Sequence, residues 1–195
     1  MAHNNHLFFD TLAHQPDKLE SYDNLRKSLQ SAFGSIETLQ KEMIGTANAM
    51  FGPGFVWLVW ASGVEPRAGT NRGYWSILTT YLAGTPYPEA GYRLQSKDQN
   101  TVPGFAAGDI VAAGNQYGKK DEIKDLGRGP GSLRAVTPIL CVNTWQHAYL
   151  EQFGVAGKNE YLKTWWETID WKKVESRLPA EAKNGPGQGI FGGRR

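Results

Sequence analysis

The chain has 195 residues, enough for one ordinary domain with a tail. Hydrophobic residues make up 40% of it and aromatic residues 12%, which suits a packed core and a sizeable partner surface. The formal net charge of +2 is too small for a protein whose main role is to coat nucleic acid, but it does not exclude local basic patches.

The cysteine content and the length of the apolar runs indicate the redox compartment and whether a membrane span is present. The single cysteine, Cys141, lies in an apolar run, which excludes a disulfide framework, fits a reducing compartment and marks a small core residue. The longest apolar run, residues 55–61, is strand-sized, whereas a membrane span needs about 20 residues. We therefore expect no membrane association. The start, MAHNNH, has the pattern of neither a signal peptide nor a transit peptide, and the chain reads as beginning inside a fold.

Three helices are expected before residue 55. Apolar residues recur at helical spacing over residues 3–14, 17–33 and 36–47. Ser35 follows a glycine and has the features of an N-cap, and the sequence FGPG at residues 51–54 ends the third helix.

Strands and further helices follow. Residues 55–60, 74–82 and 137–142 are rich in β-branched and aromatic side chains and predict three strands, the last apolar on both faces. Helical patterns then cover residues 145–153, 158–169 and 171–178, with Asn143 or Thr144 near the first cap and Asp170 as the last cap.

Two segments differ in composition from the rest. Residues 86–134 are rich in Gly, Pro, Asn and mixed charge, and predict a long irregular insertion of a kind that is usually functional or disordered. Residues 179–195 form a Gly-rich tail that ends in two arginines and has no reason to fold alone. The predicted organisation is therefore one domain over residues 1–178, with the insertion inside it and the tail behind it.

Five segments, in order, resemble motifs of the iron/manganese superoxide dismutases. They are NHLFFDTLAHQP, FGSIETLQKEMIGTANAMFGPGFVWLV, LAGTP, PILCVNTWQHAYLEQFG and EYLKTWWETIDWKKVESRL. In the family, LAGTP corresponds to Asn-Ala-Gly-Thr-Pro, and PILCVNTWQHAY to Pro-Leu-Leu followed by Asp-X-Trp-Glu-His-Ala-Tyr. The resemblance implies the C-terminal α+β domain of that fold, a three-stranded antiparallel sheet with helices, without the N-terminal helical hairpin.

The resemblance also implies a metal site with three His and one Asp ligand, which this sequence matches only in part. His6 and His147 match two of the histidines, Asn143 stands where the family has the aspartate, and the remaining histidine belongs to the hairpin. A neutral amide is a much poorer ligand than a carboxylate for a hard metal ion. We therefore expect vestigial ligand positions at His6, Asn143 and His147, with no bound metal or other cofactor. His3, one turn before His6, is an alternative ligand on spacing alone.

Other departures fall around these positions. Gln146 replaces the glutamate that, in the family, reaches across a dimer interface to the partner's metal-ligand histidine, and Asp10 replaces a tryptophan that lines the metal pocket. Trp145 is expected in the core. Because the family dimer uses this stretch, we predict that Gln146, His147 and Tyr149 lie at an interface with a dismutase-like partner.

Cations on the insertion and the tail are candidate RNA contacts. Lys119, Lys120 and Arg128 are interleaved with acidic residues, so they form either a solvated mixed-charge loop or a loop that docks on RNA phosphates or protein neighbours. Arg194 and Arg195 end a Gly-rich segment. Such a segment is compatible with insertion into a ribonucleoprotein and also with disorder.

These features favour a structural protein that keeps the dismutase-like fold over an enzyme. The resemblance extends to the degenerate superoxide-dismutase-like proteins of the fungal mitochondrial small ribosomal subunit. It implies a non-enzymatic structural protein of the mitochondrial matrix, in contact with other mitochondrial ribosomal proteins, a dismutase-like pairing partner and rRNA. The alternative is a metal-dependent superoxide dismutase represented by a truncated chain. Upstream sequence would then restore one histidine ligand but not the aspartate.

Overall fold

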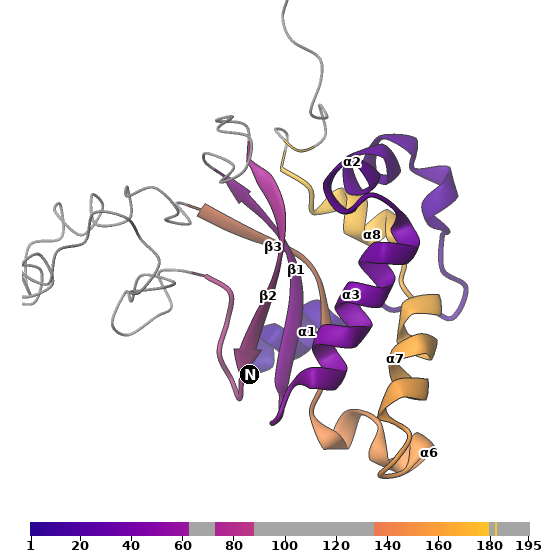
Figure 1. Cartoon of the computed structure of the whole chain (residues 1–195), viewed down its shortest axis with the longest axis vertical. Helices are drawn as coiled ribbons and strands as arrows, with labels where there is room; N and C mark the ends of the chain where they lie inside the picture. The colour runs from indigo at the N-terminus through magenta and orange to yellow at the C-terminus, as the bar shows by residue number, and fades with distance from the viewer. Residues whose placement is uncertain (63–72, 88–134, 180–181, 183–195) are drawn as a thin grey trace, which may run out of the picture.

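The computed structural model describes residues 1–62, 73–87, 135–179 and 182 (Figure 1). Short helices precede and follow the strands, so the fold is α+β as expected. The elements in chain order are α1 (Ala2–Asp10), η1 (Leu19–Ser21), α2 (Asp23–Phe33), α3 (Ile36–Ala49), β1 (Gly54–Ser62), β2 (Tyr74–Tyr81), β3 (Ala135–Asn143), η3 (Gln146–Ala148), α6 (Leu150–Phe153), α7 (Lys158–Glu167) and α8 (Trp171–Ser176).

A three-stranded antiparallel sheet in the order β2-β1-β3 forms the centre, which confirms the predicted sheet. Residues 54–61 of the middle strand β1 are all buried. A strand covered on both faces needs apolar side chains at every position, which explains the continuous run FVWLVWA. The pairing of β1 with β3 shifts between Leu58 and Val59, which leaves Ile139 of β3 opposite no residue of β1.

Helices cover both faces of the sheet. On one face, the Cys141 Sγ atom lies 4.0 Å from the carbonyl oxygen of Asn4 in α1. On the other face, the Trp75 Nε1 donates a 2.9 Å hydrogen bond to the Ser28 Oγ of α2. In Figure 1, α1 crosses behind the strands, whereas α2, α3, α7 and α8 lie to one side of them. No described helix is both long enough and apolar enough to cross a membrane.

Local capping signals work as predicted from the sequence. The Ser35 side chain accepts a 3.1 Å hydrogen bond from the Thr38 backbone N–H and begins α3. The Asp170 carboxylate accepts one of 3.0 Å from the Lys172 N–H and begins α8. Each side chain satisfies one of the free N–H groups at a helix start.

Three helices differ from the prediction. The helix expected over residues 17–33 is divided into η1 and α2, with Tyr22 between them. In the other two, tertiary contacts override the local pattern. The helix expected over residues 3–14 ends at Asp10, since Leu12 bridges to Ile169 and the chain pairs with the α7–α8 connection. The helix expected over residues 145–153 is divided into η3 and α6. Between them, Tyr149 turns inward and its ring stacks on Tyr161 at 5.6 Å.

Candidate functional site

The three residues at the predicted ligand positions come from α1, β3 and η3. Asn143 is the last residue of β3 and is 1% exposed, whereas the side chains of His6 and His147 are exposed. The His147 ring lies against Trp145, with ring centroids 5.6 Å apart. The fold brings the end of β3 beside α1, where the Asn143 Nδ2 lies 3.4 Å from the Asn5 Oδ1. The site is therefore a junction of three elements around one buried amide.

Every polar group of the Asn143 side chain has a partner within the protein. Its Oδ1 accepts a 2.9 Å hydrogen bond from the Trp145 backbone N–H, which turns the chain from β3 into η3, and its Nδ2 donates to Asn5. Its backbone oxygen accepts a 2.8 Å hydrogen bond from the hydroxyl of Tyr161 in α7. Burial raises the pKa of Tyr161, so this hydroxyl stays protonated and donates. Asn143 thus ties four elements together.

Comparison with known proteins identifies the fold family. The family described as iron/manganese superoxide dismutases, C-terminal domain, matches residues 21–73 and 116–177. The chain belongs to this family.

Relatives of two kinds are similar to this dismutase-family chain. Two are small ribosomal subunit proteins of Schizosaccharomyces pombe. The protein mS42 is 27% identical over 80% of this chain and 52% of its own length. The protein mS43 is 29% identical over 91% of this chain and 58% of its own length. The third is the mitochondrial manganese superoxide dismutase of the same organism, 27% identical over 90% of the chain and 56% of the relative. The chain therefore spans about half the length of the curated relatives it matches.

The residues present do not fit the metal that the dismutase family implies. In the part of the chain that the structure describes, no group of three or more His, Cys, Asp or Glu side chains could hold a metal ion. The Asn143 Oδ1, the atom at the position of the anionic ligand, already accepts a backbone hydrogen bond. Coordination would need a negative charge that the amide does not supply and would break that hydrogen bond.

The predicted pairing residues occupy η3 and the residue that ends it. Gln146 and His147 are exposed and available to a partner, whereas Tyr149 is 8% exposed within the chain. The Tyr149 ring contacts Tyr161 and anchors η3, so its contribution to an interface would be to position the other two. Their place at an interface stays a prediction. Trp145 is partly buried and packs against the core.

Asp10, at the position where the dismutase resemblance has a tryptophan, forms an ion cluster. Its carboxylate lies 2.7 Å from the Arg177 guanidinium and 3.5 Å from the Lys173 ammonium. Partial burial acts to raise the pKa of Asp10, but the two cations outweigh it and hold that pKa below its usual value. The Arg177 guanidinium also donates to the carbonyl oxygens of Leu7 and Ile139, at 3.4 and 3.3 Å. Arg177 thus joins α8 to α1 and to the bulge of β3.

The sequence did not single out Arg177. A carboxylate in place of an aromatic residue on a partly buried helix indicates that a cation lies nearby, but it does not say which one. The partner is 167 positions away in the chain, and only the fold brings the two together.

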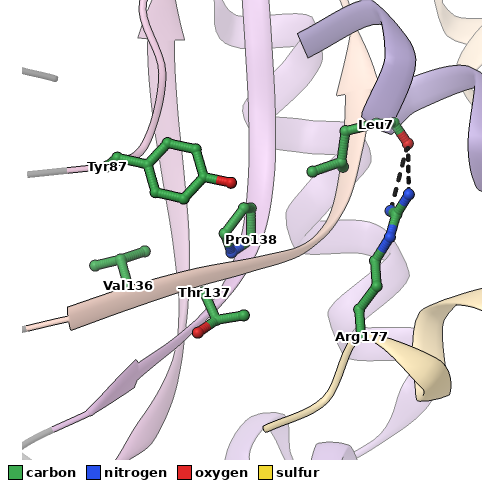
Figure 2. Close-up of a pocket in the computed structure, with 6 residues that line it drawn as sticks. All are labelled: Leu7, Tyr87, Val136, Thr137, Pro138 and Arg177. Atoms are coloured by element: carbon green, nitrogen blue, oxygen red, sulfur yellow. Dashed lines mark hydrogen bonds between the residues drawn. The ribbon is translucent and has the colours of Figure 1, made fainter. Parts of the chain in front are cut away.

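A depression of about 300 Å³ lies next to this cluster (Figure 2). The figure shows the Arg177 guanidinium turned toward the Leu7 carbonyl and away from Tyr87. The remaining wall is mostly apolar, so the depression offers few polar groups to a ligand. Its lining consists of Leu7, Tyr87, Val136, Thr137, Pro138 and Arg177.

Replacing Asp10 with asparagine should make stability less dependent on acid pH. Because the folded-state pKa of Asp10 is lowered, its ion pairs stabilise the protein above the unfolded pKa of about 4 and lose that effect as pH falls through the folded pKa. The pair is partly exposed, so we expect the variant to lose under about 1 kcal/mol at pH 7. Urea unfolding at pH 7 and pH 3 measures this. A deficit of the same size at both values would contradict the assignment.

The predicted RNA-contact residues lie outside the described residues. Lys119, Lys120 and Arg128 fall in the segment 88–134, and Arg194 and Arg195 fall in the segment 183–195. Their role stays a prediction from the sequence.

Proposed function

We propose that this chain is a structural component of the mitochondrial small ribosomal subunit, built on a catalytically inactive dismutase fold. Two observations support it. The chain is similar over most of its length to mS42 and mS43, which are named as small ribosomal subunit proteins. The buried Asn143, which holds β3, η3, α1 and α7 together in place of a metal ligand, carries the non-enzymatic part of the proposal.

In this role the fold supplies surfaces for partners. The exposed Gln146 and His147, positioned by Tyr149, would pair with a dismutase-like chain in the mitochondrial matrix. In a two-fold or pseudo-two-fold pair, the same segment of both chains meets at the axis. An amide at Gln146 can still hydrogen-bond to a histidine ring across such an interface.

The insertion and the tail would make contacts with other ribosomal proteins and with rRNA. Five cations in these segments are the candidates for phosphate contacts, which would weaken as salt rises. They are Lys119, Lys120, Arg128, Arg194 and Arg195.

The second candidate is a metal-dependent superoxide dismutase of which this chain is a part. Its support is the 27% identity to a mitochondrial manganese superoxide dismutase over 90% of the chain, a value close to those for mS42 and mS43. Residues from a longer chain would add ligands, but they would not replace the amide of Asn143 by a carboxylate.

Metal content and sedimentation distinguish the two candidates. We expect the native full-length protein, purified from its source, to hold no stoichiometric manganese or iron and to sediment with the small ribosomal subunit. Elemental analysis and gradient sedimentation of mitochondrial extract measure both. About one tightly held ion per chain in protein that stays at the top of the gradient would overturn the proposal and favour the dismutase.

A further inference from the structure

The sheet has two edge strands, β2 and β3, and the edge of β3 is protected from pairing with another chain. The strand contains Pro138, and its pairing with β1 is interrupted by a bulge. Side chains from two helices occupy its carbonyl oxygens: the Arg177 guanidinium bonds that of Ile139, and the Tyr161 hydroxyl bonds that of Asn143. Proline, bulges and covering groups are the devices by which proteins close a sheet edge.

The edge strand β2 carries neither a proline nor a bulge nor a charge. It runs over eight residues, Tyr74–Tyr81, with the sequence YWSILTTY. Its register with β1 is regular from one end to the other. A long, regular and uncharged edge is a template on which a further strand can pair.

The register identifies the backbone groups of β2 that point away from the sheet. One step beyond the ladder, the Leu82 N–H donates to the Pro53 carbonyl at 2.8 Å, so the even-numbered residues of β2 are those that bond to β1. The N–H and C=O groups of Trp75, Ile77 and Thr79 therefore point outward. No backbone hydrogen bond joins these groups to another of the elements that the structure describes.

These three residues form a self-complementary pattern. In an antiparallel pair of two β2 strands centred on Ile77, Trp75 of each strand lies opposite Thr79 of the other, and Ile77 lies opposite its own copy. Each outward N–H then meets an outward carbonyl, and none of these groups is left over. A charged side chain at position 77 would face a like charge, which destabilises a strand pair, so the uncharged sequence favours a second copy as the occupant.

We propose that the outer edge of β2 is an interface between two copies of this chain, whose sheets join into one across a two-fold axis at Ile77. The inference goes beyond the proposed function and does not depend on it, because the edge can pair in the free protein. It also leaves Gln146 and His147 available to a dismutase-like partner, since η3 follows β3 and not β2.

Charge exchange at position 77 tests this interface. Ile77→Lys and Ile77→Glu, each in the full-length protein, place two like charges opposite one another. We therefore expect sedimentation velocity to show half the mass of the wild-type assembly for either variant alone. An equal mixture of the two should restore the wild-type mass, because the facing charges are then opposite. Val155→Lys, at an exposed residue between α6 and α7, is the matched control and should keep the wild-type mass.

Ile77→Pro is the second variant, for use if a charge at this partly buried position prevents folding. Because the Ile77 N–H points away from β1, proline removes an edge donor and leaves the ladder between β1 and β2 intact. The variant should have half the wild-type mass and an unchanged circular dichroism spectrum. Three results would overturn the inference: a monomeric wild-type protein, the wild-type mass in a folded position-77 variant, or a mixture of folded Lys and Glu variants that stays at half mass.

Discussion

Replacing Arg177 with methionine is expected to lower the free energy of unfolding by about 3 kcal/mol, because several partners lose a charged donor at once. The Asp10 carboxylate would keep only the longer 3.5 Å contact to Lys173. The carbonyl of Ile139, the residue of β3 that lies opposite no residue of β1, would lose the donor that Arg177 supplies. Methionine keeps the apolar stem of the side chain, so the packing beside Leu7 is largely preserved. Chemical denaturation at neutral pH measures the loss.

The matched control is Arg26→Met. Arg26 lies 2.9 Å from Asp23 in the first turns of α2, so it also forms an ion pair, but one that is local and exposed. Exposed pairs of this spacing contribute about 0.3–0.5 kcal/mol. If both variants lost the same small amount, Arg177 would be an ordinary surface cation, and its assignment as the link between α8, α1 and β3 would be wrong.

The parts of the fold that the sequence predicted are those with a local cause. The run FVWLVW at residues 55–60 predicts a strand because its residues are β-branched and aromatic and because it is too short for a core helix. Ser35 and Asp170 mark helix starts because a capping side chain bonds a backbone N–H only two or three residues away. Such signals do not depend on the rest of the chain.

The parts that the sequence did not predict depend on residues far apart in the chain. Helix α1 ends early because Leu12 pairs with Ile169, and the helix after β3 is interrupted because Tyr149 stacks on Tyr161. The candidate site shows the same division. The resemblance located Asn143 and its lost charge, but only the structure shows that its amide holds Trp145 and that Tyr161 bonds its carbonyl.

Replacing Asn143 with aspartate is expected to destabilise the protein without creating a metal site. The side chain is 1% exposed, and its described partners include no cation. A carboxylate there would place an oxygen, in place of the donor Nδ2, next to the Asn5 Oδ1. It would also lose solvation, so its pKa would be raised. We expect a loss of about 2 kcal/mol at pH 7, by analogy with other buried polar groups that lose their partners. Because the folded pKa would exceed the unfolded value of about 4, the loss should be absent below pH 4 and grow as pH rises through the folded pKa.

Excess manganese provides the decisive comparison for this variant. A ligand that binds only the folded state raises the free energy of unfolding. If the wild-type metal pocket were intact except for the missing aspartate charge, added manganese would bind the variant and restore the lost stability. We expect no recovery, because His6 and His147 are exposed and no described acidic or histidine cluster completes a coordination sphere. Asn24→Asp, the same change at an exposed residue of α2, is the control and should shift stability by no more than about 0.5 kcal/mol. If manganese stabilised the Asn143→Asp variant but not the Asn24→Asp control, the metal pocket would be intact apart from the amide at position 143, and our expectation would be wrong.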